Sequence, residues 1–174
     1  MWQGEKQPHK QTEPGEGEIM LSEDKWKQYG LPDFEPKGIV IHNTNNQLWS
    51  AKRIEEFLQN ENQGSNGCHY VVDHKEVRQI MPLDWSSYST GMGTDFGNTH
   101  CIAIEICSNP SNRLYLQGQD RAIKLIRKLM KKYHLTTDDI FFHRDFCPNI
   151  NCPAQILKLY GSKARFLALL KGAK

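Results

Sequence analysis

Long apolar runs are absent from this sequence of 174 residues. No segment approaches the roughly 20 consecutive apolar residues that a membrane-spanning helix needs. The polar N-terminus also lacks the apolar core of a secretory signal peptide. We therefore expect a protein without a membrane span that is made in the cytoplasm and is not exported by a signal peptide.

A large excess of either charge is absent as well. The 22 Lys and Arg residues and the 20 Asp and Glu residues give a formal net charge of +2 and are spread along the chain. Residues 119–133 carry a basic helical face, which is typical of a solvated surface. Because there is no basic stripe to follow a phosphate backbone, nucleic acid is not expected as a partner.

Cysteines are few, and their number is odd. They lack the even, regular spacing of a disulfide framework. We expect reduced thiols, with at least one of them acting as a metal ligand. The five positions are Cys68, Cys101, Cys107, Cys147 and Cys152.

The length is sufficient for one domain with a full hydrophobic core and is short for two. Residues 1–20 are rich in Gln, Glu, Gly, Pro and Lys and contain almost no apolar side chains. Such a segment cannot offset the entropy cost of becoming ordered. We interpret residues 1–20 as a disordered tail or linker and residues 21–174 as one folded domain, which we expect to be a monomer.

Strand and helix patterns alternate along the rest of the chain. Ser50 is a predicted N-cap, and residues 73–76 form a turn between two strands that we expect to pair as a hairpin. This order predicts an α/β fold with a central mixed β-sheet flanked by helices on both faces. The predicted strands are 39–41, 69–72, 77–81, 100–107 and 140–142, and the predicted helices begin at Ser22, Ser50, Gln119 and Ala154, the last with a break near Gly161.

The strand at 100–107 has the clearest pattern. Its period of two places Cys101, Ala103, Glu105 and Cys107 on one face and three Ile residues on the other. A carboxylate in the middle of an apolar strand is costly to bury unless it has a task or a cationic partner. Glu105 is therefore a candidate catalytic residue.

Two short strands each end at a histidine. His42 follows residues 39–41, His143 follows residues 140–142, and Cys147 and Cys152 come shortly afterwards. Two His and one Cys are sufficient for a zinc site that keeps its fourth position open for water, as in a hydrolase. A lone His would more often be a hydrogen-bonded core residue, so the prediction depends on the two segments meeting in the fold. Cys147 is the less favoured alternative to Cys152.

Four ordered segments resemble one known family. They are residues 40–44 (VIHNT), 68–73 (CHYVVD), 102–106 (IAIEI), and 143–145 (HRD) followed by Cys152 and Pro153. Together they resemble the zinc-dependent N-acetylmuramoyl-L-alanine amidases of the amidase-2 type. This family includes many phage and prophage endolysins and is related to the peptidoglycan recognition proteins. The resemblance covers about residues 37–160.

The resemblance implies a site, a reaction and a place of action. His42, His143 and Cys152 would bind one Zn²⁺, and Glu105 would activate the water on it. The reaction is hydrolysis of the amide between the lactyl group of N-acetylmuramic acid and L-alanine, in bacterial peptidoglycan or muropeptides. The enzyme would reach the wall after phage or prophage lysis, or by another route. The positions expected to contact substrate are His69, Asn43, Thr44 and Tyr88.

Three positions depart from the family pattern. Many relatives have Lys two positions before the Cys ligand, where this chain has Ile150, and some phage relatives have a catalytic Tyr where this chain has Cys68. Ser89 stands where a His is common. The cation that would stabilise an oxyanion is therefore missing, and we hypothesise that Asn149, Asn151 or a backbone amide of this loop replaces it as a hydrogen-bond donor.

Two other functions are compatible with these residues. A peptidoglycan-binding module without catalysis is favoured by the missing Lys, whereas the retained Cys152 and Glu105 argue against it. The second alternative is an amidase that acts on soluble anhydro-muropeptides, as recycling enzymes do. Those enzymes usually have Asp where this chain has Cys152, which argues against this alternative.

Overall fold

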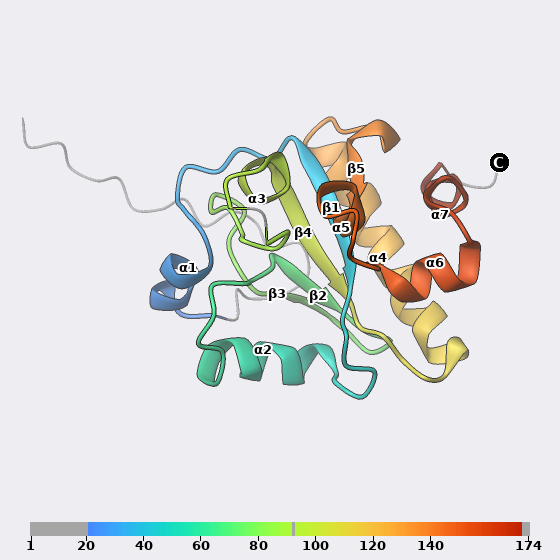
Figure 1. The fold of residues 1–174 in the computed structure, drawn as a ribbon, viewed down its shortest axis with the longest axis horizontal. Helices are drawn as coiled ribbons and strands as arrows, with labels where there is room; N and C mark the ends of the chain where they lie inside the picture. Colours follow the sequence, from blue (N-terminus) through green and yellow to red (C-terminus); the bar gives the residue numbers. More distant parts are fainter. Residues whose placement is uncertain (1–20, 92, 172–174) are drawn as a thin grey trace, which may run out of the picture.

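The computed structural model describes residues 21–91 and 93–171, so the predicted tail at 1–20 lies outside the described residues. Figure 1 shows a central sheet with helices packed on both sides. None of the described helices is long and apolar enough to span a membrane. In chain order the elements are α1 (Glu23–Tyr29), β1 (Gly38–Asn43), α2 (Ala51–Asn60), β2 (Tyr70–Val72), β3 (Val77–Gln79), α3 (Phe96–His100), β4 (Cys101–Ile106), α4 (Asn112–Lys132), the 3-10 helix η1 (Thr137–Asp139), β5 (Ile140–Phe142), α5 (His143–Phe146), α6 (Ala154–Tyr160) and α7 (Lys163–Leu170).

The sheet is mixed, with strand order β3-β2-β4-β1-β5. β4 and β1 form its centre and run parallel to each other, and β2 and β5 are also parallel to them. β3 pairs with β2 in the antiparallel direction, which confirms the predicted hairpin. The carboxyl ends of β1, β4 and β5 therefore lie at the same edge of the sheet, where catalytic groups of α/β proteins commonly collect.

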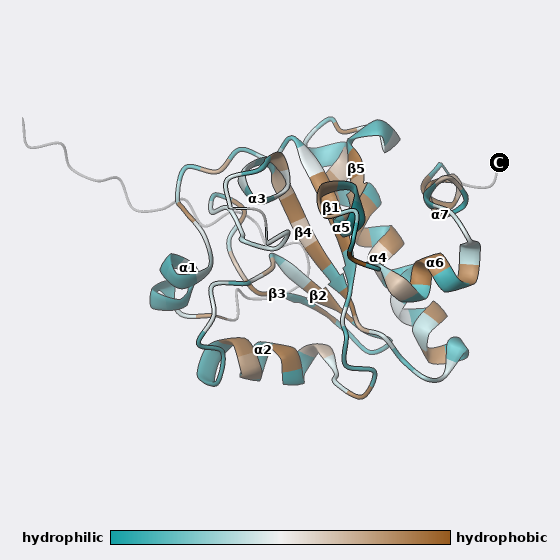
Figure 2. Ribbon diagram, in the orientation of Figure 1, coloured by the Kyte–Doolittle hydropathy of each residue, from teal (hydrophilic) through white to brown (hydrophobic). Residues whose placement is uncertain are grey.

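The two faces of the sheet pack into two hydrophobic cores. One core contains the Ile residues of β1 and β4 together with the apolar side of α4, and the other contains Val40, Cys101, Ala103 and Cys107 together with the apolar side of α2. Figure 2 shows the apolar colouring concentrated on the central strands and on parts of α2 and α4. The alternation predicted for residues 100–107 is therefore confirmed, and Glu105 shares the face covered by α2.

Local signals in the sequence explain where the helices begin and end. The Ser50 hydroxyl accepts a hydrogen bond from the backbone N–H of Arg53, as expected for the N-cap of α2. Gly161 has φ +73°, a left-handed conformation that glycine adopts without strain, and it separates α6 from α7. α3 begins just before β4, and its N-cap is Asp95, whose side chain accepts from the backbone N–H of Asn98.

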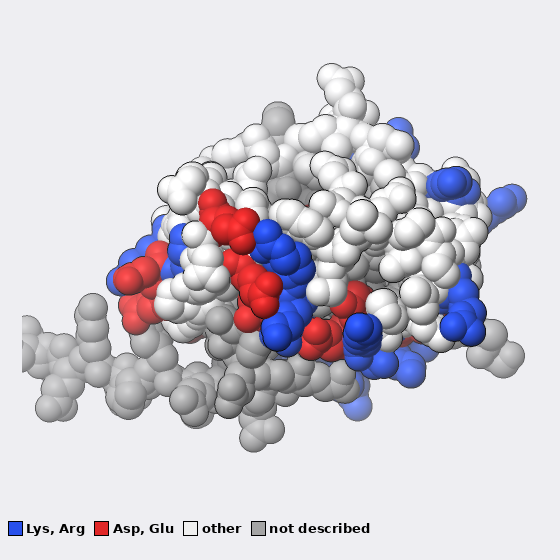
Figure 3. Space-filling view, turned by 90° about the horizontal axis from the view of Figure 1, so that it is seen from below, with Lys and Arg blue, Asp and Glu red and all other residues white. Residues whose placement is uncertain are grey.

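The face that carries α2 has charged side chains of both signs on part of its surface. Figure 3 shows acidic and basic side chains interspersed over this face. Ion pairs join Arg53 to Glu61 at 2.7 Å and Arg78 to Glu55 and Glu76. The charges on this face are therefore partly paired with each other.

Candidate metal centre and cavity

His42 and Glu105 are neighbours across the two central strands. The parallel register of β1 and β4 pairs His42 directly with Glu105, so both side chains point to the same face of the sheet. His42 Nδ1 lies 3.9 Å from Glu105 Oε1. The two residues are 63 positions apart in the chain, and the sheet alone brings them together.

His143 and Cys152 complete the group from the opposite end of the chain. His143 opens α5 directly after β5, and the backbone N–H of Arg144 donates to the carbonyl of Cys152 at 3.1 Å, which closes the intervening loop. Cys152 Sγ lies 3.8 Å from His42 Nδ1. Ligand atoms of His42, His143 and Cys152 all lie within 4.8 Å of one another.

This donor set fits a zinc ion. Two imidazoles and one thiol converge, and Glu105 adds a carboxylate whose Oε2 is buried without a hydrogen-bond partner in the protein. Three protein ligands leave a tetrahedral ion with one open position. The site can therefore hold zinc in the form that hydrolases use, with an acid or base group beside it.

Burial sets the protonation of the group. It lowers the pKa of His42 to about 3, with a further contribution from nearby His143, so the ring is neutral and free to bind a cation. Burial raises the pKa of Cys152 to about 12, assisted by the negative charge of Glu105. It also raises the pKa of Glu105 to about 7. Because the thiolate is the ligand form, binding of a metal would release the proton of Cys152.

The carbonyl of Thr90 orients the second histidine. His143 Nε2 lies 3.0 Å from this oxygen, which favours the tautomer with its proton on Nε2 and leaves Nδ1 for the cation. Cys147 Sγ donates to the same oxygen at 2.9 Å. Cys147, the less favoured ligand, is therefore engaged with the backbone and is not part of the convergent group.

Asn43 and Thr44 lie on the cavity wall, but their side chains are occupied by the protein itself. Asn43 Oδ1 accepts from the backbone N–H groups of Gln155 and Ile156, and its Nδ2 donates to the Ile106 carbonyl and the Tyr115 hydroxyl. The Thr44 hydroxyl donates to the Asn46 carbonyl and accepts from the Ser108 N–H. Both residues shape the wall, and any contact they make with substrate is in addition to these bonds.

His69 and Tyr88 are not among the residues that line the cavity. His69 is completely buried, accepts from the Ala103 N–H at Nδ1 and contacts the Trp85 carbonyl through Nε2 at 2.8 Å. Both ring nitrogens of His69, an expected substrate contact, are therefore engaged with backbone groups of the protein. Tyr88 has its backbone N–H and carbonyl paired with Tyr29 and Gly67, beside the site and not in it.

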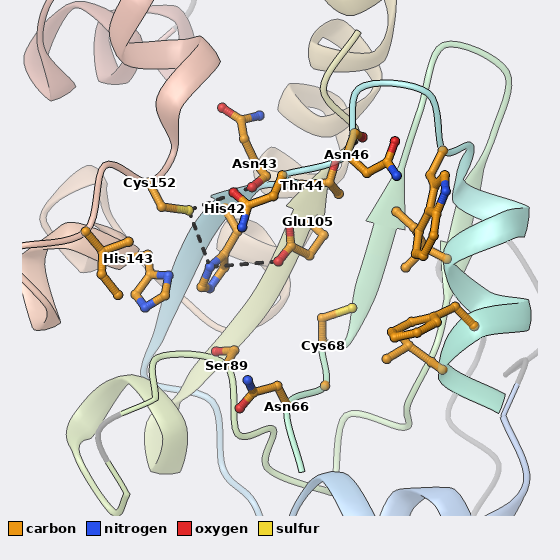
Figure 4. A pocket seen from close by; sticks show the side chains of 17 residues that line it. His42, Asn43, Thr44, Asn46, Asn66, Cys68, Ser89, Glu105, His143 and Cys152 are labelled. Carbon is orange, nitrogen blue, oxygen red and sulfur yellow. Dashed lines mark hydrogen bonds and ion pairs between the residues drawn. The ribbon is translucent and has the colours of Figure 1, made fainter. Parts of the chain in front are cut away.

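One cavity of about 480 Å³ opens onto the centre, a size typical of small-molecule sites. In Figure 4, His42, His143, Cys152 and Glu105 cluster together, with Asn66 and Ser89 on one side and Asn43 and Thr44 on the other. Asn149 and Asn151, proposed as donors, are not on the wall, whereas Ile150 is. Trp49, an aromatic residue that could stack on substrate, is on the wall as well. Other wall residues from α2 and its neighbouring loops are marked by no motif in the sequence, and these are Asn45, Asn46, Ile54, Phe57, Leu58, Asn66 and Gly67.

An α/β domain with a His-His-Cys centre and an adjacent carboxylate in an open cavity has the form of a metal-hydrolase domain. The particular family follows from its sequence. Residues 32–155, well over half of the chain, match the family model of N-acetylmuramoyl-L-alanine amidases, Amidase_2. The chain belongs to this family.

Named relatives agree with this assignment. Two Bacillus subtilis (strain 168) proteins named N-acetylmuramoyl-L-alanine amidase, CwlA and CwlH, are 34% and 31% identical over 135 and 147 residues. These matches cover 75% and 83% of this chain but 48% and 56% of the relatives, so the chain spans about half their length. The solved PlyG catalytic domain is 26% identical with a TM-score of 0.78, covering 87% of this chain and 90% of that domain. The structure of PlyL, at 24% identity and a TM-score of 0.80 over 88% of this chain and 95% of that one, shares the fold.

Proposed function

We propose that this chain is a zinc-dependent N-acetylmuramoyl-L-alanine amidase domain. Its substrate would be bacterial peptidoglycan, and the bond cleaved would join the lactyl group of N-acetylmuramic acid to L-alanine. The observation that carries this proposal is the position of Glu105 beside His42, next to His143 and Cys152, at the base of an open cavity. Family membership and the names of the relatives supply the bond and the substrate class.

His42, His143 and Cys152 would hold the ion. When bound, zinc supplies Lewis acidity for the scissile carbonyl and brings the pKa of a water molecule to about 7. The chain contributes the rigid placement of the three ligands, since His42 belongs to the central strand and Cys152 is tied to α5 by its carbonyl.

Glu105 would move the proton. Its carboxylate would take a proton from the attacking water and then return it to the nitrogen of the leaving L-alanine, so the amide C–N bond breaks without releasing a free amide anion. The side chain is 26% exposed, so it can contact both the ion and the substrate. Burial raises the pKa of Glu105 to about 7, and a bound divalent cation would lower that pKa and favour the carboxylate form.

The remaining predictions follow from the same function. We propose that residues 21–174 form the catalytic domain, that the domain is a monomer, and that it acts on the cell wall after lysis or by another route. A peptidoglycan-binding module is the second candidate, favoured by Ile150 on the cavity wall where a cation was expected. Retention of Glu105 and Cys152 favours the enzyme, because a binding module has no need of either.

Mass spectrometry of the products released from purified peptidoglycan tests the proposal. Incubation with the protein should release stem peptides with a free L-alanine amino terminus, and a zinc chelator should stop their appearance. Addition of zinc after removal of the chelator should restore it. Binding to the wall without any released peptide would favour the binding module, and release that continues in the chelator would contradict zinc dependence.

A further inference from the structure

The hydroxyl of Ser89 is buried and has no hydrogen-bond partner in the protein, yet Ser89 lines the cavity. Buried polar groups are normally paired, so an orphaned hydroxyl at a cavity wall points to a partner that comes from outside. Among the described residues that line the cavity there is no Lys or Arg. Besides a bound metal ion, a negative charge that develops on a substrate in this cavity would therefore have only neutral donors on the wall.

Other neutral donors on the wall are less suited to this task. The side chains of Asn43 and Thr44 are already hydrogen-bonded within the protein. Asn45, Asn46 and Asn66 are exposed, so solvent competes for their amides. The Ser89 hydroxyl needs to break no existing bond, and its hydrogen can rotate about the Cβ–Oγ bond to meet a partner.

The backbone of Ser89 is fixed in place. Asn98, which is 1% exposed, accepts at Oδ1 from the backbone N–H groups of Ser89 and Thr90 at 2.7 and 2.8 Å. The carbonyl of Thr90, one peptide further on, contacts His143 Nε2. One short segment thus holds both a candidate metal ligand and the free hydroxyl, which is the preorganisation that stabilises a developing charge effectively.

Ser89 also lies on the appropriate side of the centre. In the view of Figure 4, Ser89 and Asn66 lie below the imidazole ring of His42, on the side opposite Asn43. Because Glu105 and Ser89 line the same cavity, a carbonyl bound at the centre could meet both the carboxylate and the hydroxyl.

We propose that Ser89 is a catalytic residue whose hydroxyl donates a hydrogen bond to the carbonyl oxygen of the scissile amide, an inference that rests on the proposed function. As the water oxygen adds to the carbonyl carbon, the π electrons move onto the carbonyl oxygen, and the hydrogen bond from Ser89 strengthens. The hydroxyl keeps its proton throughout. When the carbonyl re-forms, the C–N bond breaks and the alanine nitrogen leaves with the proton carried by Glu105.

Three variants test this inference on a soluble muramoyl peptide, with kcat, KM, zinc content and melting temperature measured for each. Ser89→Ala removes the hydroxyl, and Ser89→Thr keeps it. Ser87→Ala is the matched control, because Ser87 is fully buried, its hydroxyl also has no partner, and it does not line the cavity. Removal of an oxyanion donor typically lowers kcat on the order of 100-fold or more.

The expected result is a loss on the order of 100-fold in kcat for Ser89→Ala with KM changed by less than about threefold. Zinc content and melting temperature should equal or exceed those of the wild type, because no protein partner loses its bond. Ser89→Thr should recover most of kcat, and Ser87→Ala should match the wild type.

The inference would be overturned if kcat of Ser89→Ala stayed within about twofold of the wild type, or if only KM changed. An equal loss of kcat in Ser87→Ala would overturn it as well. So would a fall in melting temperature or zinc content in Ser89→Ala. An inactive wild type that still binds zinc and muropeptide would instead overturn the proposed function. The two failures are therefore distinguishable in one set of measurements.

Discussion

Asn43 Oδ1 accepts a hydrogen bond from the backbone N–H of Gln155 at 3.0 Å, and this contact joins the end of β1 to the start of α6. The residue before Asn43 is the candidate ligand His42, and Cys152 lies three positions before Gln155. The same oxygen accepts from the Ile156 N–H, so Asn43 supplies the cap that Pro153, as N-cap, cannot supply with its side chain. One amide thus sets the spacing between two candidate ligands.

Asn43→Ala should weaken both folding and metal binding. The change leaves two backbone N–H groups, the Ile106 carbonyl and the Tyr115 hydroxyl without their partner, and we expect a loss of about 2 to 3 kcal/mol in the free energy of unfolding. Zinc affinity should fall roughly 10- to 100-fold because Cys152 is no longer held in register with His42. Urea unfolding and competition with a chelator measure the two effects. Asn45→Ala, an exposed change on the same wall, is the control, and equal losses in both variants would contradict the argument.

Glu105→Gln should remove most turnover while keeping zinc and the fold. The amide cannot accept the proton of water, so we expect kcat/KM to fall by about 100- to 10,000-fold. In the wild type, kcat/KM should rise with pH as Glu105 loses its proton, at or below the pKa of about 7 that burial gives it, since a bound cation lowers this pKa. The acidic limb of the pH profile should be absent in the variant. Glu61→Gln, a change at a half-exposed surface pair, should behave as the wild type, and a fully active Glu105→Gln protein would exclude the base assignment.

Cys152 and Cys147 are distinguished by zinc content. Cys152→Ser places a weaker ligand in the convergent group, and we expect a loss of zinc affinity of at least about 10-fold. Cys147→Ser should leave affinity unchanged, because a serine hydroxyl can also donate to the Thr90 carbonyl. Metal analysis after dialysis against a graded chelator gives the comparison. A loss of zinc affinity in Cys147→Ser but not in Cys152→Ser would show that Cys147 is the ligand.

His69 should make the fold sensitive to acid. Burial lowers the pKa of His69 to about 4, from an unfolded value near 6.5, so the folded state holds the ring neutral. The unfolded chain therefore binds a proton first as the pH falls, and this residue's stabilising contribution is complete above about pH 6.5 and declines down to about pH 4. The difference corresponds to roughly 3 kcal/mol.

Urea unfolding between pH 4 and pH 7.5 measures the contribution of His69. His69→Gln should show a smaller fall in the free energy of unfolding over this range than the wild type, although its stability at pH 7 will be lower because hydrogen bonds to Ala103 and Trp85 change. His134→Gln, a change at an exposed position, is the control and should follow the wild-type curve. If the free energy of unfolding changed with pH equally in the wild type and in His69→Gln, His69 would not be the source of the acid sensitivity.

Much of the fold could be predicted because it depends on local patterns. The period of two around Glu105 fixed which side chains share a face, and Ser50 and Gly161 marked helix boundaries through their intrinsic preferences. The candidate ligands His42 and His143 were predictable because each ends a strand, and parallel strands present their carboxyl ends at one edge. His69 shows the limit of this approach, because a histidine in a strand looks the same in the sequence whether it faces a cavity or two backbone groups.

Periodicity and residue chemistry were sufficient to predict the five strands, the beginnings of α1, α2 and α6, the two candidate histidine ligands and the place of Glu105 on the face opposite the Ile row. The pairing of His42 with Glu105, the membership of Cys152 and not Cys147 in the group, and the unpaired hydroxyl of Ser89 at the cavity came from the folded chain. These features depend on strand register, loop closure and hydrogen bonds between groups 50 to 110 residues apart. No local pattern in the sequence shows which of these distant groups will be in contact.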